Sequence, residues 1–260
     1  MTDEYLKQQM KDLMKQVFGL VWEDIPEMEG ERRPDFQVTS LAKDVTIVEL
    51  KAKGDDPSGL EEETAALRKG GIVSRAVPLN RRNTLSGIIE DGVEQLKSYG
   101  TPDTFRVLWL HSWGRDRKLL RDRFHATLYG TTSIVDLNGS ASRTGFFVDF
   151  NDFYRYRDVL EGAVLTTESE AQLCINSLSD RAEVFRGSGF VAAFAKGLCD
   201  PGDLERRGEA YVADCDLDRR KRNEVMNYIR KKYGRDRLMD IDLQYHSAAM
   251  TVPVDGNESR

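Results

Sequence analysis

Apolar residues recur every three or four positions in several stretches of the chain, and this spacing predicts amphipathic helices. The two clearest stretches are residues 2–20 and residues 83–100. Asn83 or Thr84 is a suitable cap for the second helix, and Gly100 is a suitable end. Further helices are expected over residues 60–69, 116–128, 152–160, 180–198 (interrupted at 187–189) and 219–232, the last of them basic and closed by Gly234.

Short runs of β-branched and aromatic residues lie between these helices and predict strands. The most distinct run covers residues 45–53 and follows a shorter one at residues 36–39. The mixture of strands and helices predicts an α/β (α+β) fold. Because the character of the sequence changes near residue 162, we expect a domain over residues 1–160 and a smaller α/β accessory region over residues 161–260. Other strands are expected over residues 104–111, 132–137, 144–150, 172–177 and 211–217, with turns at 138–140 and 200–203.

The first two strands are separated by residues 41–44, a segment short enough for a hairpin loop. If the turn centres on Ala42, Asp35 and Glu49 lie opposite each other, since each is seven positions from residue 42. Opposed side chains on one face of a sheet have Cβ atoms about 4.5–5.5 Å apart. Two carboxylates at that distance repel each other unless a cation lies between them, and Mg²⁺ is a hard cation that takes carboxylate and water ligands. The spacing therefore predicts a metal site.

Side chains alternate along a strand, so Glu49 and Lys51 share one face while Val48 and Leu50 point the other way into a core. A bound metal would polarise a phosphate and lower the pKa of a bound water. Lys51 could orient that water or stabilise the charge that develops on phosphorus. The alternative is an ordinary amphipathic strand whose charged face, which includes Lys53, is solvated.

A third group of candidate residues lies near the end of the helix expected over residues 83–100. Gln95 and Tyr99 are four positions apart, so they meet on one helical face. The alternative is a core tyrosine beside a solvent-facing glutamine.

These motifs occur in a recognisable order: Pro34-Asp35, then Glu49-Leu50-Lys51, then Gln95-x-x-x-Tyr99. In this order they resemble the PD-(D/E)XK nuclease superfamily, and the last motif is similar to its RecB-like branch. The resemblance covers about residues 1–110. It implies a restriction-endonuclease-like mixed sheet flanked by helices, and cleavage of DNA with Mg²⁺, or with Mn²⁺ in its place. By the same resemblance Asp35 and Glu49 are metal ligands, Lys51 is the catalytic lysine, and Gln95 and Tyr99 support the site or the DNA.

Many members of that superfamily carry one more acidic residue on the helix before the first core strand. Glu4 lies on the helix expected over residues 2–20, and Glu23 follows that helix. Either residue could complete the set of metal ligands, and each could equally be an ordinary solvated charge.

Composition limits the class of protein. The 260 residues are 40% hydrophobic and contain no run of eighteen apolar residues, so we expect no membrane-spanning helix. The acidic, polar N-terminus is unlike a signal peptide. The three cysteines are odd in number and far apart, which favours a reducing cytoplasm and argues against a disulfide framework or a zinc site. The three histidines, His111, His125 and His246, are scattered and suggest no metal cluster.

The net charge of −6 requires that any DNA-binding surface be local. The segment between the predicted catalytic strand and the Gln-x-x-x-Tyr helix is basic and could reach over the active site. Its basic residues are Arg68, Lys69, Arg75, Arg81 and Arg82. Residues 115–123 and 218–237 are two other basic runs, and any of the three could be only a solvated surface.

A second, weaker resemblance lies in the C-terminal region. Residues 186–189, 200–201 and the Asp214-x-Asp216-x-Asp218 triplet are similar to a stretch of the palm of C-family bacterial replicative DNA polymerases. The resemblance implies that Asp216 and Asp218 hold metal. However, Arg219 stands where that family has phenylalanine, and the printed chain ends before a third catalytic carboxylate, so we do not expect a working polymerase.

Three functions follow as hypotheses. The first is a Mg²⁺-dependent DNA nuclease acting in restriction, defence or repair, alone or with a partner subunit or an ATPase. The second is a DNA-binding or assembly module of the same fold that does not cleave. The third is a nucleotide-handling protein that uses Asp216 and Asp218. Sequence specificity, oligomeric state and the choice between endonuclease and exonuclease stay open.

Overall fold

The computed structural model describes residues 3–55, 57–78, 83–139, 142–241 and 246–251. Its helices are α1 (Asp3–Phe18), α2 (Pro57–Arg68), α3 (Asn83–Lys97), α4 (Arg117–Tyr129), α5 (Asp152–Arg155), α6 (Ala182–Arg186), α7 (Gly189–Ala193), α8 (Pro201–Arg206) and α9 (Arg222–Tyr233). Its strands are β1 (Val21–Asp24), β2 (Phe36–Thr39), β3 (Val45–Lys53), β4 (Val73–Pro78), β5 (Phe105–Ser112), β6 (Thr132–Asp136), β7 (Ser142–Phe146), β8 (Gly162–Thr166), β9 (Ala171–Ile175), β10 (Leu198–Cys199), β11 (Ala210–Val212), β12 (Leu238–Ile241) and β13 (His246–Thr251).

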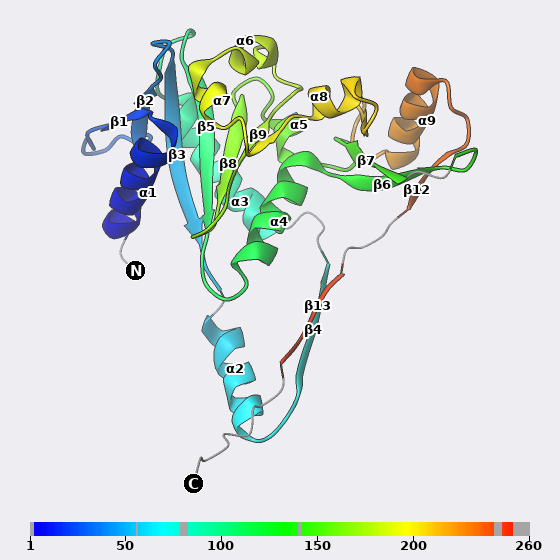
Figure 1. Ribbon diagram of the computed structural model, residues 1–260, viewed down its shortest axis with the longest axis horizontal. Coiled ribbons are helices and arrows are strands. Elements are labelled where there is room, and N and C mark those ends of the chain that lie inside the picture. The colour runs from blue at the N-terminus through cyan, green and yellow to red at the C-terminus, as the bar shows by residue number, and fades with distance from the viewer. Residues whose placement is uncertain (1–2, 56, 79–82, 140–141, 242–245, 252–260) are drawn as a thin grey trace.

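A seven-stranded mixed sheet forms the centre of the molecule, in the order β1-β2-β3-β5-β8-β9-β10 (Figure 1). β2 is antiparallel to both of its neighbours, β1 and β3, whereas β3, β5 and β8 are parallel. A four-stranded sheet of order β11-β7-β6-β12 lies beside it. The predicted mixed α/β fold, with helices flanking the sheets, is therefore confirmed.

Both faces of the central sheet are packed. Alternate residues of β3 enter different hydrophobic clusters, with Ile47 on the side of α3 and α4, and Val48 and Leu50 on the side of α1, α6 and α7. This alternation follows from the two-residue period of a strand. The side that holds Ile47 also holds Glu49, which is only 2% exposed, so the alternative of a solvated charged face is wrong for this residue.

The β2–β3 hairpin has the predicted register. Phe36 pairs with Val48 and Thr39 with Val45, so the sum of paired residue numbers is constant and the turn centres on residue 42. Within the turn, Ser40 N donates to the Asp44 carbonyl and Lys43 takes a left-handed φ of 66°. One residue beyond the last pair, the same register sets Asp35 opposite Glu49.

The central sheet continues past residue 160, where the accessory region was expected to begin. β8, which the sequence pattern did not reveal, pairs with β5, and β9 and β10 extend the same sheet. The second sheet likewise joins β6 and β7 to the later strands β11 and β12. Residue 160 therefore does not separate two sheets.

Two shorter segments differ from expectation. Residues 200–203 were expected to form a turn, but Asp200 accepts from the backbone N–H of Gly202 and caps α8, in which Pro201 is the first residue. Proline at that position is preorganised for a helix and loses no hydrogen bond there. The helix expected over residues 152–160 ends at Arg155, and turns follow it. The tail from Pro253 lies outside the described residues, as does Ser140 of the predicted 138–140 turn.

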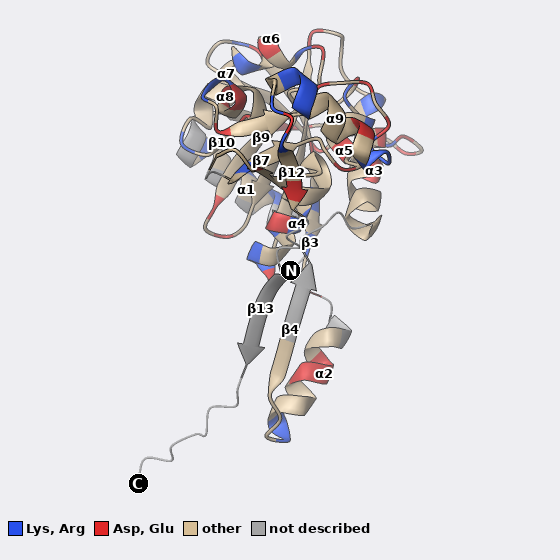
Figure 2. Cartoon of the chain, turned by 90° about the vertical axis from the view of Figure 1, so that its right-hand side faces the viewer, with Lys and Arg blue, Asp and Glu red and all other residues tan. Residues whose placement is uncertain are grey.

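An arm extends from the body at the end of β3. It consists of α2 and of β4, which pairs antiparallel with β13 from the other end of the chain. In Figures 1 and 2, α2, β4 and β13 lie below the body in two perpendicular views. No helix in the described ranges combines the length and hydrophobicity that crossing a membrane requires.

Candidate functional site

Asp35 lies at the start of β2, and its carboxylate is held from two sides. The backbone N–H of Leu50 donates to Oδ2 at 2.8 Å, and the Lys7 ammonium of α1 lies 2.5 Å from Oδ1. The carboxylate is only 10% exposed. Because Leu50 directly follows Glu49, the first contact fixes Asp35 beside the second carboxylate.

Glu49 is the buried carboxylate of the site. Its Oε1 lies 2.9 Å from the Lys51 ammonium, and its Oε2 has no hydrogen-bond partner although it is buried. Burial, reinforced by the negative charge of Asp35, raises the pKa of Glu49 to about 8 and outweighs the opposing effect of Lys51. An unpaired buried oxygen of this kind is costly to a fold, so the site favours a proton or a cation at Oε2.

Lys51 has three acceptors. Its ammonium lies 2.6 Å from Gln95 Oε1, 2.7 Å from Asp91 Oδ2 and 2.9 Å from Glu49 Oε1. Burial alone would lower the pKa of Lys51, but the hydrogen bond to Asp91 and the charge of Glu49 together raise it. Lys51 is therefore a fixed, protonated cation at the site.

Gln95 and Tyr99 both contact the chain segment that leads to Asp35. The helix expected to reach residue 100 ends at Lys97, so Tyr99 lies in the turn after α3 and not on the helical face of Gln95. Gln95 accepts from Lys51 and donates through Nε2 to the backbone carbonyl of Arg33 at 3.2 Å. The guanidinium of Arg33 lies over the Tyr99 ring, 5.9 Å from its centre. Gln95 therefore connects the lysine to the backbone two residues before Asp35.

The close approach of α3 to β3 depends on Gly92. A Cβ atom at this position would lie 2.6 Å from Leu108 Cδ2, 3.4 Å from Glu49 Cγ and 3.5 Å from Lys51 Cε. The first of these distances is too short for real carbon atoms. The missing side chain allows the helix to cover both site residues of β3.

These residues form one wall of an open cleft of about 1380 Å³ between α1, the 25–35 loop, β3 and α3. Its basic lining residues come from three parts of the chain, namely α1, the 25–35 loop and β3: Lys7, Lys11, Arg32, Arg33 and Lys51. Its acidic lining residues are Asp24, Glu27, Glu31, Asp35 and Glu49. The cleft thus brings basic side chains near the two carboxylates.

The residues of the site fit a hard divalent metal. Two carboxylates meet there, and one buried carboxylate oxygen lacks a partner. Asp35 and Glu49 are oxygen ligands of the type that Mg²⁺ takes, and Mn²⁺ accepts the same set. Glu4, the predicted additional ligand, lies on α1 one turn before Lys7, but its side chain lies outside what the structure describes.

The predicted DNA-binding segment lies largely away from this cleft. Arg68 ends α2, at the end of the helix that points away from the body (Figure 1), and neither Arg68 nor Lys69 lines the cleft. Arg81 and Arg82 lie outside the described residues, as does the side chain of Arg75.

The aspartates of the polymerase-like stretch bind separate basic residues. Asp214 contacts Lys232 and Tyr228, Asp216 contacts Arg157, and Asp218 contacts Arg220. Asp216 is 91% exposed.

The glycine-serine part of that stretch has structural contacts. Ser188 caps α7, and Gly189 donates to Asp44 in the β2–β3 turn. Arg186 forms a two-bond pair with Asp200, the cap of α8. These contacts explain the positions of Arg186, Ser188 and Gly189 without a bound nucleotide.

Sequence reasoning missed Asp91, Lys7 and Arg32. Asp91 precedes Gln95 by four positions, so the helical period could have placed it on the Gln95 face. Arg32 pairs with Asp91 at 3.0 Å. No local pattern marks Lys7 or Arg32, because their contacts join segments that are far apart in the chain.

Comparison of the chain with protein-family models, with curated proteins and with solved structures gives no match.

Proposed function

We propose that this protein is a Mg²⁺-dependent DNA nuclease. The observation that carries the proposal is the meeting of Asp35, Glu49 and Lys51 on one wall of an open cleft, with a buried Glu49 oxygen that lacks a partner. When bound to the two carboxylates, Mg²⁺ would supply a Lewis acid for the phosphate and an acidified water.

The chain's own residues support hydrolysis in three ways. Lys51 is held by Gln95, Asp91 and Glu49, so its positive charge is preorganised beside the reacting phosphate rather than recruited from solvent. Glu49 is buried, so bulk water would not compete with its carboxylate for a bound metal ion. Leu50 N–H and Lys7 fix the direction of the Asp35 carboxylate.

The cleft suits a polymeric substrate. Its volume of about 1380 Å³ exceeds the roughly 300–1,000 Å³ of ordinary small-molecule pockets. Lys11, Arg32 and Arg33 lie along it and can contact phosphates on either side of the scissile bond. We propose DNA as the polymer because of the motif resemblance.

One experiment separates the functions. The protein is incubated with linear and with covalently closed circular DNA, in Mg²⁺ and in EDTA, beside the Glu49→Ala variant. Nuclease activity predicts cleavage in Mg²⁺ by the wild type alone, with cutting of closed circles marking an endonuclease and loss of linear DNA alone an exonuclease. Absence of cleavage by the wild type, or equal cleavage by both proteins, contradicts the proposal.

A non-cleaving DNA-binding module is the second candidate. The observation in its favour is that lysine ammonium groups already compensate both carboxylates, Lys7 at Asp35 and Lys51 at Glu49. This module would bind DNA with the same affinity in Mg²⁺ and in EDTA and would leave it intact.

A further inference from the structure

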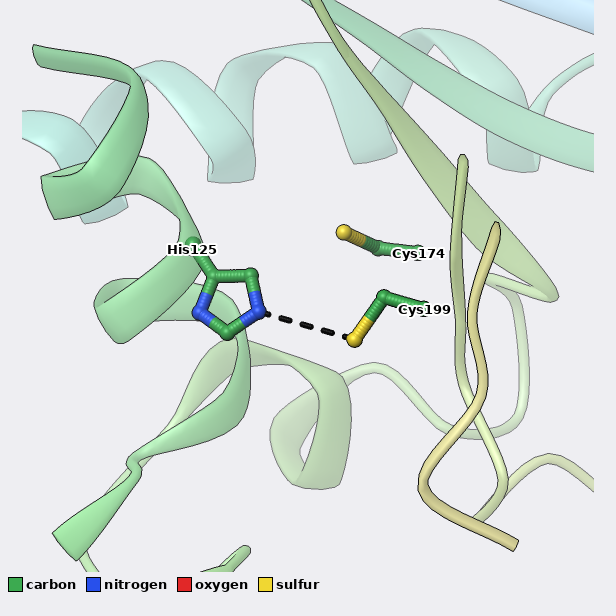
Figure 3. Close-up of side chains that lie close together, drawn as sticks. All are labelled: His125, Cys174 and Cys199. Carbon is green, nitrogen blue, oxygen red and sulfur yellow. Dashed lines mark hydrogen bonds between the residues drawn. The ribbon is translucent and has the colours of Figure 1, made fainter. Parts of the chain in front are cut away.

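Outside the cleft, the fold brings together three potential metal ligands that lie far apart in the sequence. Cys174 on β9 and Cys199 on β10 are register partners in neighbouring parallel strands. His125 lies on α4, and Figure 3 shows its ring directed toward both sulfurs. The separation of these residues along the chain gave no sign of a metal cluster, and their proximity arises only from tertiary packing.

The spacing of the three ligand atoms fits one small ion. His125 Nε2 lies 3.6 Å from Cys199 Sγ, and one ligand atom from each residue lies within 4.8 Å of the other two. In a tetrahedral zinc site, Zn–S bonds of about 2.3 Å and Zn–N bonds of about 2.05 Å set neighbouring ligand atoms about 3.5–3.8 Å apart. The His125–Cys199 pair already has that separation.

The two sulfurs are buried and the histidine is partly covered. Cys174 and Cys199 are buried, whereas His125 is half-buried, so an ion can enter from the histidine side. The rings of Tyr129 and Phe146 lie beside His125 and limit access of water. Tyr129, one turn after His125, hydrogen-bonds to the carbonyls of Ile175 and Cys199 and so ties the same helix to the same two strands.

The ligand types differ from those of the cleft. Two thiolates and an imidazole select a borderline-soft ion such as Zn²⁺, whereas the cleft offers only hard oxygen donors. Hydrogen bonding from the Cys174 thiol, and then contact with His125, lowers the pKa of Cys199, whereas burial raises the pKa of Cys174.

We propose that His125, Cys174 and Cys199 form a Zn²⁺ site that ties α4 to β9 and β10. On binding, both thiols release their protons to solvent and bind as thiolates, and His125 binds as the neutral imidazole through Nε2. The Zn²⁺ stabilises the folded chain by linking three elements, and it is independent of the proposed nuclease site. A disulfide between the two register partners, or an ordinary pair of buried thiols, is the competing outcome.

Titration of the reduced, metal-free protein with Co²⁺ tests the proposal, because thiolate ligation gives a charge-transfer absorption that carboxylates cannot give. We expect one Co²⁺ per chain with thiolate charge transfer and tetrahedral visible bands, abolished by one equivalent of Zn²⁺. Glu49→Ala must retain the spectrum, which distinguishes this site from the cleft. Zn²⁺ should also raise the melting temperature of the wild type, and a chelator should reverse the rise.

Variants identify the ligands. Cys174→Ala, Cys199→Ala and His125→Gln should each lose the spectrum or weaken Zn²⁺ binding by more than about 100-fold. Removing a residue that only hydrogen-bonds to a metal ligand lowers metal affinity by up to about 100-fold, so removing a ligand itself should cost more. Cys215→Ala is the matched control, since Cys215 is a free cysteine outside the cluster, and it should bind as the wild type does.

The wild type decides the question even if a variant fails to fold. No thiolate band at saturating Co²⁺ overturns the proposal, and so does a band that survives all three substitutions. A Cys174–Cys199 disulfide in the protein isolated without reductant, detected by peptide mass spectrometry after blocking of free thiols, would assign the pair to redox chemistry and overturn it as well.

Discussion

The Lys51 ammonium lies 2.6 Å from the side-chain oxygen of Gln95, and this contact joins the central sheet to α3 at the cleft. Gln95 donates in turn to the Arg33 carbonyl, so one amide connects the lysine with the segment that leads to Asp35. An amide suits this position because it accepts from the cation and donates to the carbonyl at the same time. Whether these contacts support cleavage, as predicted for Gln95, is tested by substitution.

Gln95→Ala should slow cleavage about tenfold or more while leaving the fold intact. Lys51 would lose one of its three acceptors, and its charge would no longer be held in one position. Glu94→Ala is the control, because Glu94 is the exposed neighbour of Gln95 and pairs with the exposed Lys97. Single-turnover cleavage rates measure the effect, and thermal melting of both variants checks that they are folded. Equal cleavage rates for the two variants would contradict a positioning role for Gln95.

Gly92→Ala should destabilise the protein by about 1–3 kcal/mol, because the new methyl group overpacks the contact with Leu108. It should also reduce cleavage, since α3 would move away from Glu49 and Lys51. Gly87→Ala is the matched control on the same helix: a Cβ there meets nothing within 4 Å, and the exposed substitution should stabilise α3 by up to about 1 kcal/mol. Urea unfolding of the two variants measures the difference, and an equal free energy of unfolding would contradict the close packing.

The stability of the metal-free protein should fall as pH rises. The pKa of Glu49 is about 8 in the folded protein against an ordinary 4.5, so between these values the native state holds more protons than the unfolded state. The free energy of unfolding therefore decreases through this window, by at most about 1.4 kcal/mol per pH unit. Unfolding in EDTA at several pH values should show this slope in the wild type.

Glu49→Gln provides the comparison, because it keeps the shape and cannot ionise. Its free energy of unfolding should change less with pH over the same window, and Mg²⁺ at pH 8 should stabilise the wild type more than the variant. Parallel pH profiles for the two proteins would mean that Glu49 ionises normally.

Arg32→Ala should weaken DNA binding without sequence preference and reduce the dependence of log K on log salt by about one unit. Arg32 is 74% exposed and lines the cleft, so its loss would remove a proposed phosphate contact together with the ion pair to Asp91. Arg68→Ala tests the segment predicted from sequence, because Arg68 lies on the arm. Binding of each variant to one duplex is measured at several salt concentrations. A larger loss of affinity for Arg68→Ala than for Arg32→Ala would indicate that DNA binds to the arm and not to the cleft.

Local geometry explains which parts of the site the sequence could predict. Hairpin register is a short-range rule, so it predicted the opposition of Asp35 and Glu49. The helical period is a second such rule, and it failed for Tyr99 because α3 ends at Lys97, before that residue. Asp91, which pairs with Lys51, lies four positions before Gln95 and follows the helical period, but it was not among the predicted site residues.

Other features depend on contacts between distant segments, and no short-range rule reaches them. Lys7 meets Asp35 from another element, and Cys174 meets Cys199 only because β9 and β10 are neighbours. β8 was missed because the short run Gly162–Thr166 gives little periodic signal, yet it is fully buried and extends the central sheet past the expected boundary.

The most direct test of the central claim compares two lysines on the same face of β3. Lys51 is held at the cleft by Glu49, whereas Lys53, two positions later, is exposed and does not line the cleft. In single-turnover cleavage of DNA in Mg²⁺, Lys51→Ala should lose about 100-fold or more of the wild-type rate, and Lys53→Ala should retain it. Equal rates for the two variants, or no cleavage by the wild type, would contradict the account.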